Sequence, residues 1–495
     1  MRSLSAGWRA ESDDAVIAIR SWNVFSTHSP LVGQYTQLHS GYDLGPLLYW
    51  LLAIPVHLDP AHGALWGAAF WCVVAGVVAV EAAWSVSRWA GVGVALAVVW
   101  TTWWMPALAV NPIWNPYVGD IFFYLTICSA YATVRGRHRW WPVAVVAGSI
   151  ATQSHLAFAL GSVVLVVLSG AVVLRRALKA HSVDSALTGG LGAAGLCWIF
   201  PIVQEILGSP GNLTQLWTSQ STQAGMGLAF GLRGLAASVF PKPLWLFREP
   251  TTLVTAQIRS DSVAVAIIVG VLTLAIAAAA KAARKPALAY LAAFSLCSSA
   301  CLVATYSSVA SNKLITFQYI VVTTLPIGCL VWLTVLSAAA AAVSHLHLRE
   351  GVPKRAPQRG RTGWSGRIGR LGPAPLGAVA ALVAVSAVSQ VREAETPNSM
   401  DSPSSIAFSQ EATAKIEGLL PRGPVDLNVV QTKSLTTPLL SYGVLYGLAW
   451  QLQQDGWAPL VPPLGVLPPQ YDAAAGEPSA QVRLSPHGIT VHVHN

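Results

Sequence analysis

The chain has 495 residues, of which 54% are hydrophobic and 10% are charged, whereas an ordinary soluble domain carries about 25% charged residues. This composition excludes a string of soluble domains and indicates a membrane protein. The net charge of +9 does not indicate nucleic-acid binding, because the basic residues stand in short clusters between apolar runs. We predict an all-α polytopic membrane protein with a small C-terminal α/β domain.

Residues 1–62 precede the first long apolar run. Within them, the stretch 45–58 (GPLLYWLLAIPVHL) is apolar but too short to cross a bilayer, which requires about 20 residues. We predict a helix that lies at the membrane interface, with Tyr49 and Trp50 at headgroup depth.

Ten later runs are apolar enough to predict transmembrane helices. The fourth and fifth runs are short and nearly continuous, so that Gln153, Ser154 and His155 stand at the tip of a tight hairpin. The predicted spans are about 64–86, 91–110, 114–134, 140–154, 155–174, 186–206, 262–280, 287–305, 316–344 and 374–391. All six cysteines fall inside these runs, and we expect them to be free thiols that pack as small hydrophobic side chains.

Lys and Arg concentrate in alternate connections between the runs, which the positive-inside rule assigns to the cytoplasm. The remaining connections then face outward, together with the loop 207–261 and both ends of the chain. The cytoplasmic loop 345–373 is rich in Arg, Gly and Pro and is predicted to be disordered. The other basic connections contain Arg88; Arg135, Arg137 and Arg139; Arg175, Arg176 and Lys179; and Lys281, Arg284 and Lys285.

This topology places residues 1–62 outside, although the first 40 residues contain neither an apolar span nor the apolar core of a signal peptide. We therefore expect a first transmembrane helix to be missing ahead of this sequence. The alternative is that the short segment crosses the membrane without help.

The tail is polar and Pro-rich after residue 392. Helical patterns at 408–419 and about 436–455, a strand-like stretch at 424–430 and an alternating strand pair near 480–494 predict a compact α/β module. The chain therefore divides into an outer segment 1–62, a transmembrane domain 63–392 and a soluble extracytoplasmic domain 393–495.

Two adjacent carboxylates, Asp13 and Asp14, stand at the head of an amphipathic stretch in the outer segment. Mutual repulsion and burial raise the pKa of one member of such a pair, so that it can accept a proton near neutral pH. A general base has this property. The alternative is that Ser12, Asp13 and Asp14 cap the helix that follows.

The acidic pair followed by Gly-Pro-x-x-Tyr-Trp at 45–50 resembles the lipid-linked sugar transferases of the GT-C fold, in particular actinobacterial arabinosyl- and mannosyltransferases. The outer NPIWNP at 111–116, the Gln-x-His at 153–155 and the soluble tail agree with that architecture. The chain departs from the family at its front, because the family's first transmembrane helix precedes the acidic motif.

The resemblance implies a transferase that moves a sugar from a polyprenyl-phosphate donor to a cell-envelope glycan, lipid or protein outside the cytoplasmic membrane. Asp13 or Asp14 would take the proton of the acceptor hydroxyl. The leaving phosphate requires cations, because negative charge grows on its oxygen. Lys313 is the first choice, with an interfacial snorkelling lysine as the alternative; the other outer candidates are Arg233, Lys242, Arg248 and Arg259.

Asp120 lies one turn inside the outer end of its span, where a carboxylate requires a partner. It orients the acceptor, joins a metal with the acidic pair, or pairs with Arg20 or Lys313. Gln153 and His155 bind sugar hydroxyls or satisfy broken backbone at a helix junction. The remaining substrate-binding candidates are His28, Gln34 and His39.

The expected partners are the lipid-linked sugar donor, a glycan or lipid acceptor and membrane lipids, with no nucleic acid. No residue spacing specifies a metal site, although some GT-C enzymes use a divalent cation, and no other cofactor is expected. The alternative function is a transporter or flippase of lipid-linked glycans, which places ionisable groups near the bilayer midplane. Most ionisable groups of this chain stand at the ends of the apolar runs.

Overall fold

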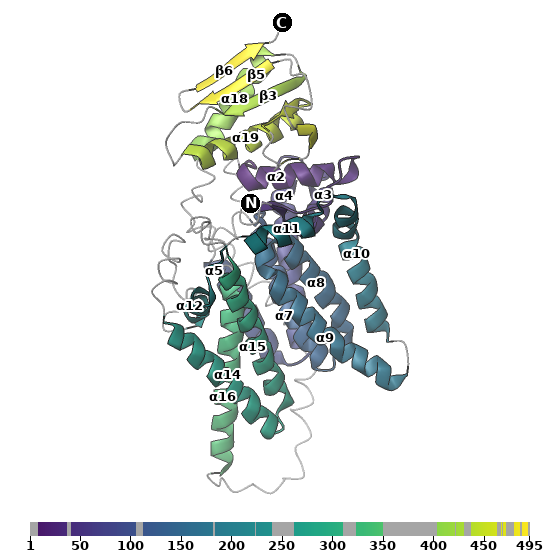
Figure 1. The fold of residues 1–495 in the computed structure, drawn as a ribbon, viewed down its shortest axis with the longest axis vertical. Coiled ribbons are helices and arrows are strands. Elements are labelled where there is room, and N and C mark those ends of the chain that lie inside the picture. The colour runs from purple at the N-terminus through teal and green to yellow at the C-terminus, as the bar shows by residue number, and fades with distance from the viewer. Residues whose placement is uncertain are drawn as a thin grey trace, which may run out of the picture.

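A computed structural model gives the fold as a helical membrane domain with a small α/β domain at the C-terminus (Figure 1). The structure describes residues 8–36, 41–104, 112–181, 184–222, 224–239, 262–309, 323–349, 403–420, 422–429, 437–462, 467, 469–471, 480–485 and 488–493. The predicted span at 374–391 and most of the loop 345–373 lie outside these residues.

Seven helices in the described part of the chain are long and apolar enough to cross a membrane, which makes this a multi-pass membrane protein. They coincide with seven of the ten predicted runs, so that the predicted fold class is confirmed. These spans run over Gly63–Trp84 (α4), Asn115–Val134 (α7), Leu156–Ala180 (η3 and α9), Ser185–Leu207 (α10), Val263–Ala282 (α14), Pro286–Ser308 (α15) and Leu325–Val343 within α16 (Thr324–Arg349). Two further predicted runs form shorter described helices, α5 (Arg88–Trp104) and α8 (Trp141–Ser154).

The helix α7 is the centre of the bundle. The most apolar stretch of α7 is 89% buried, whereas the corresponding stretches of α10 and α14 are 22% buried and present most of their surface to lipid. Small residues allow the neighbours of α7 to approach closely. A side chain at Gly148 of α8 would meet Val166 of α9 at 3.0 Å and Thr126 of α7 at 3.4 Å, so this glycine lets three helices pack together.

The cationic connections meet at one end of the bundle. Arg137 Nε donates to the carbonyl of Ser85 at 3.0 Å and joins the α7–α8 turn to the end of α4. Tyr131 Oη donates to the carbonyl of Ala287 at 3.1 Å and joins the end of α7 to the start of α15. The α7–α8 and α9–α10 turns also line one cavity of about 410 Å³, formed by Gly136, Arg137, His138, Arg139, Arg176, Asp184, Ser185 and Ala186.

The opposite end carries the helices α2 (Ser12–Trp22) and α11 (Asn212–Thr222), which run across the bundle rather than along it (Figure 1). A 3-10 turn η1 (Asn23–Phe25) and a short hairpin of β1 (Tyr35–Thr36) and β2 (Gly41–Tyr42) lead from α2 to α3 (Leu47–Leu58). The helix predicted at 45–58 is confirmed as α3, a 12-residue apolar helix shorter than the spans. The helix α12 (Leu228–Val239) packs on α14, α15 and α16.

The C-terminal domain lies beyond α2, and α19 stands between its sheet and α2 (Figure 1). The predicted helices and strands of the tail are present, and among its described residues the three-residue strand β4 and the turn η7 were not predicted. The domain consists of α18 (Pro403–Leu419), β3 (Pro424–Val429), α19 (Thr437–Gln454), β4 (Ala458–Leu460), the turn η7 (Pro469–Tyr471), β5 (Ala480–Ser485) and β6 (Gly488–Val493). The sheet order is β4-β3-β5-β6, in which β3 is parallel to β4 and β5, since α19 supplies the crossover between β3 and β4.

The two ends of the bundle are predicted to face opposite sides of the membrane, with α11 outside. A cysteine introduced at the exposed residue Thr218 of α11 should react with a membrane-impermeant maleimide in intact cells. A cysteine at the exposed residue Lys179 at the end of α9 should react only after permeabilisation. The reverse pattern would contradict the orientation inferred from the cationic connections.

A candidate active site around Asp13 and Asp43

The carboxylate of Asp13 lies in the first turn of α2 and contacts segments distant in sequence. Oδ1 accepts a hydrogen bond from Gln34 Nε2 at 3.3 Å, and Oδ2 accepts one from Trp114 Nε1 at 3.1 Å. The residue before it, Ser12, has a left-handed backbone with φ 51°, which is strained for a residue with a Cβ atom. The Asp13 carboxylate therefore does not cap α2 but points toward the membrane domain.

A second carboxylate, Asp43, follows the hairpin and is 2% exposed. Its Oδ1 accepts from the backbone N–H of Leu156 at 3.0 Å, and its Oδ2 accepts from Asn115 Nδ2 at 3.2 Å. Asp43 thereby satisfies the first N–H after the break between α8 and α9. The sequence predicts no role for Asp43, since nothing in the local pattern shows which backbone group its side chain meets.

Burial raises the pKa of Asp13, and the hydrogen bonds from Trp114 and Gln34 offset part of this effect. Burial raises the pKa of Asp43 well above its ordinary value; the hydrogen bonds from Leu156 and Asn115 oppose this effect, and the negative charge of Asp13 adds to it. The two carboxyl groups are thus close enough to repel each other, and each holds its proton to a higher pH than a solvated aspartate.

Arg20 brings a buried positive charge to the same region. It is 4% exposed, donates from Nη1 to the carbonyl of Gly33 at 3.1 Å, and lies over the rings of Tyr42 and Tyr49 at 5.3 and 5.7 Å. Tyr49 Oη donates to Gln34 Oε1 at 3.1 Å. The amide of Gln34 is therefore held between Tyr49 and Asp13, so that the two motifs singled out in the sequence meet through one side chain.

Gln153 connects two helices to the end of α8. Its Nε2 donates to the carbonyl of Cys197 at 2.7 Å, and its Oε1 accepts from the N–H of Leu47 at 3.3 Å. Cys197 precedes Pro201 by four residues in α10, and proline has no N–H to offer to that carbonyl. Leu47 is the first residue of α3, where an N–H has no partner within the helix. Both bonds satisfy backbone groups at a junction, which is one of the two roles considered for Gln153.

His155 has a similar position at the break between α8 and α9. Its Nδ1 accepts from the N–H of Ala157 at 3.2 Å and caps η3. His28 is exposed, and its hydrogen bonds among the described residues are to Thr27 and Ser26. The structure thus brings Gln34 to Asp13 and leaves His28 at the surface.

Asp120 is fully buried inside α7. Neither of its carboxyl oxygens has a hydrogen-bond partner among the described residues, and the pairing with Arg20 that the sequence suggested is not formed. Arg233 lies on α12, on the side of the bundle formed by α14, α15 and α16. The candidates His39, Lys242, Arg248, Arg259 and Lys313 lie outside the described residues.

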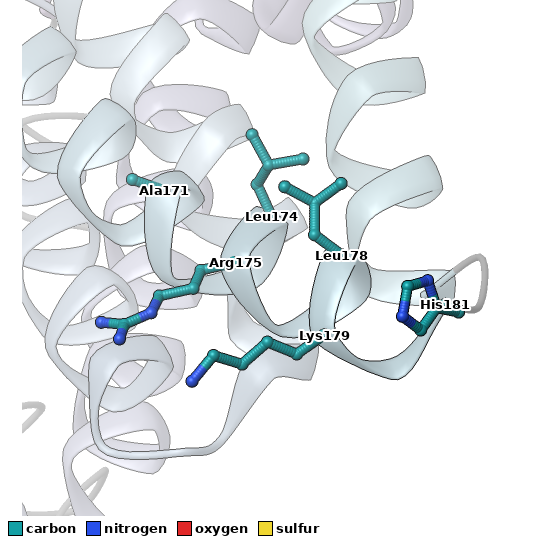
Figure 2. Close-up of a pocket in the computed structure, with 6 residues that line it drawn as sticks. All are labelled: Ala171, Leu174, Arg175, Leu178, Lys179 and His181. Atoms are coloured by element: carbon teal, nitrogen blue, oxygen red, sulfur yellow. The ribbon is translucent and has the colours of Figure 1, made fainter.

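A cavity of about 570 Å³ lies at the cationic end of the molecule rather than near Asp13. Figure 2 shows that its lining comes from one stretch of chain at the end of α9, with Arg175 and Lys179 on one side and Leu174 and Leu178 on the other. It is a groove on a single helix. Among the described residues, no cluster of three His, Cys, Asp or Glu side chains could hold a metal ion.

No protein-family model matches this chain, and no curated protein matches it. Two solved structures of ArnT from Cupriavidus metallidurans are similar in fold. The apo structure has a TM-score of 0.45 and 15% identity and covers 97% of this chain and 89% of its own. The structure bound to undecaprenyl phosphate has a TM-score of 0.44 and 14% identity, and the match covers 96% of this chain and 89% of the ArnT chain. Likeness at this level carries no argument about activity, which has to come from the residues of the site.

Replacing Gln153 by Leu should lower the free energy of unfolding by about 2 to 4 kcal/mol, because the Leu47 N–H and the Cys197 carbonyl lose their partner. In a Pro201→Ala background the same replacement should cost about 1 to 2 kcal/mol less, since residue 201 then supplies an N–H to Cys197. A double-mutant cycle of denaturation in detergent measures this coupling. Additive effects would show that the glutamine does not compensate for the proline.

The raised pKa values of Asp13 and Asp43 predict a pH dependence of stability. Above pH 3.8, their ordinary value, the folded protein binds these protons more tightly than the unfolded chain, so that stability falls as the pH rises through the raised pKa values. Thermal melting between about pH 4 and about pH 8 should show this decline, and Asp43→Asn should flatten it. The slope is the readout, because the new amide cannot accept both hydrogen bonds. An unchanged slope in Asp43→Asn would contradict the attribution of the decline in stability to Asp43.

Proposed function

We propose that this protein is a membrane glycosyltransferase that moves a sugar from a polyprenyl-phosphate donor to an acceptor hydroxyl, with Asp13 as the general base. The observation that carries the proposal is the Asp13 carboxylate itself. It is held by two neutral donors, Gln34 and Trp114, at the end of the bundle away from the cationic turns, and burial raises its pKa. Such a carboxylate is a stronger base than a solvated aspartate, as general-base catalysis requires.

The proposed step is a single displacement. The acceptor oxygen attacks the anomeric carbon of the sugar, the bond from that carbon to the phosphate oxygen breaks, and the lipid phosphate leaves with the bonding electrons. The acceptor proton passes to Asp13, and the anomeric configuration inverts. Arg20 supplies a buried positive charge beside the site, and Lys242 and Lys313 remain proposed partners of the phosphate from the sequence alone.

The closer kinship, with actinobacterial arabinosyl- and mannosyltransferases, is part of the same proposal. Its support is that the acidic pair and the Gly-Pro-x-x-Tyr-Trp segment at 45–50 converge in space. Tyr49 of that segment donates to Gln34, and Gln34 donates to Asp13. The proposed site faces outward, on the side of the membrane opposite the cationic connections.

A transporter of lipid-linked glycans is the second candidate, and Asp120 is the observation that favours it. This carboxyl is fully buried in the central helix α7 and has no hydrogen bond among the described residues. Ionisable groups at membrane depth mark transport pathways in many carriers. The transferase remains the stronger proposal, because most of the polar contacts of the candidate site stand at the end of the bundle.

Replacing Asp13 by Asn should lower the transfer rate by about 10²- to 10⁴-fold, since the amide cannot take the acceptor proton. Membranes that contain the protein are given a panel of radiolabelled polyprenyl-phosphate sugars, and incorporation is measured for the wild type, Asp13→Asn and Asp14→Asn. Transfer by the wild type should fall as the pH is lowered through the raised pKa of Asp13.

Asp59→Asn is the matched control, because Asp59 is a partly exposed carboxylate in the α3–α4 turn. Its transfer rate should equal that of the wild type. Equal rates in the wild type and Asp13→Asn, with equal protein levels, would exclude the general base. Loss of glycan export in Asp120→Asn alone would then favour the transporter.

A further inference from the structure

The C-terminal domain contacts both ends of α2 through buried polar side chains. At the N-terminal end, Ser409 Oγ of α18 donates to Glu11 Oε1 at 3.0 Å, and Gln451 Nε2 of α19 donates to Ser409 Oγ at 3.2 Å. Thr413 Oγ1 donates to Gln451 Oε1 at 3.1 Å. Glu11 is 1% exposed and Ser409 is fully buried, so this network lies inside the contact between the two domains.

The other end of α2 is held by a second network. Asn23 Nδ2 donates to Tyr471 Oη at 3.2 Å, and Tyr471 Oη donates to Gln453 Oε1 at 2.9 Å. The ring of Trp22 meets the ring of the buried Trp450 edge-on at 6.2 Å. Both networks use α19, which therefore lies along α2 and fixes it at its two ends.

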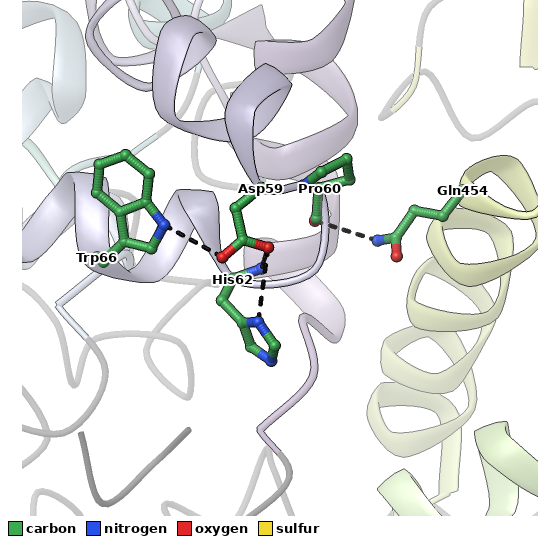
Figure 3. A network of polar contacts seen from close by, with 5 residues as sticks. All are labelled: Asp59, Pro60, His62, Trp66 and Gln454. Atoms are coloured by element: carbon green, nitrogen blue, oxygen red, sulfur yellow. Dashed lines mark hydrogen bonds and ion pairs between the residues drawn. The ribbon is translucent and has the colours of Figure 1, made fainter. Parts of the chain in front are cut away.

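A third contact ties α19 to the turn between α3 and α4. Gln454 Nε2 donates to the carbonyl of Pro60 at 3.2 Å. Figure 3 shows this bond beside the turn in which Asp59 receives the indole N–H of Trp66 and lies against His62. The domain thus contacts α2 and the turn that follows α3. The helices α2 and α3 flank the hairpin.

Gly447 of α19 sets how closely α19 approaches the start of α2. A Cβ atom at this position would lie 3.0 Å from Glu11 Cγ and 3.2 Å from the carbonyl oxygen of Ala10. These distances are tighter than ordinary van der Waals contact. Any side chain at 447 would therefore displace residues 10 and 11 by a few tenths of an ångström.

We infer that the C-terminal domain positions the Asp13 carboxylate. Glu11 is the positioning residue, because it connects this domain to Asp13. Glu11 is anchored to Ser409, Ser12 turns the chain through a left-handed conformation, and Asp13 follows with its hydrogen bonds to Gln34 and Trp114. The inference rests on the proposed role of Asp13 as the base.

The burial of Glu11 supports a positioning role. Burying a carboxyl group is costly unless the group is hydrogen-bonded or paired, and apolar residues would join two domains without that requirement. The hydrogen bond from Ser409 to Glu11 Oε1 fixes the direction of the side chain as well as the distance between the domains. Because Glu11 is two residues from Asp13, a shift of the first moves the second, and misplacement of a reacting group by about 1 Å lowers a rate by up to about 100-fold.

The test is Gly447→Ala, with Gly418→Ala as its matched control. Gly418 lies in α18 of the same domain, and a Cβ atom there meets no atom within 4 Å. Alanine favours a helix over glycine at both positions, so neither change should weaken its helix. Gly447→Ala should lower kcat for sugar transfer by about 10-fold or more with little change in KM, and Gly418→Ala should leave both constants at the wild-type values.

Hydrogen–deuterium exchange of α2 is measured in the same proteins, and Ser409→Ala serves as a second variant that removes the hydroxyl donor to Glu11. Faster exchange of the first turn of α2 together with a lower kcat supports the inference. Unchanged exchange, or faster exchange with an unchanged kcat, overturns it. Transfer that survives Asp13→Asn would overturn the proposed function, whereas transfer that depends on Asp13 but not on Gly447→Ala or Ser409→Ala would overturn this inference alone.

Discussion

The candidate site depends on the burial of one carboxylate, Asp43, where the helices α8 and α9 separate. Its oxygens accept from the Leu156 N–H and from the amide of Asn115, and the same amide donates to the Ser154 carbonyl at 2.8 Å. A backbone group without a partner is strongly destabilising where water is excluded. Asp43 and Asn115 satisfy the backbone of this break and thereby allow the chain to turn here.

The arrangement of the other site residues follows from the position of Asp43. The backbone of Asp43 pairs with Gly33 and Gln34, and a Cβ atom at Gly33 would meet Asp43 Cβ at 2.7 Å. The hairpin is thus fixed against Asp43, and Gln34 is fixed with it. Gln34 then holds Tyr49 on one side and Asp13 on the other, so that a structural carboxylate orients the carboxylate that is proposed as the base.

The sequence predicted the membrane-spanning helices well because length and hydropathy determine them locally, whereas α11 and α12 lie in the stretch 207–261 that was predicted as a loop. Runs of about 20 apolar residues must be helices that satisfy their own backbone in lipid, and the tail showed the alternation of strands and the longer period of helices. The contacts of Asp13 with Trp114 and of Asp43 with Leu156 join segments distant in sequence. No local pattern specifies such pairs, because they depend on how α7 and the α8–α9 break pack against α2.

Gln153 is a contact that the sequence predicts only in part. The sequence itself shows that the carbonyl of Cys197 lacks its helical partner, because Pro201 stands four residues later in a helical run. Which side chain fills the gap depends on the packing of α8 against α10. The structure supplies the Gln153 amide.

The identity of the donors explains why Asp13 and not a salt-bridged residue suits the proposed chemistry. An arginine or lysine beside a carboxylate stabilises its charge and lowers its pKa, which weakens it as a base. Arg176 stands in this relation to Asp184, at 3.7 Å. Asp13 instead accepts from an amide and an indole, both neutral. These donors orient the carboxylate without neutralising it, so that burial dominates and the basicity that proton transfer requires is retained.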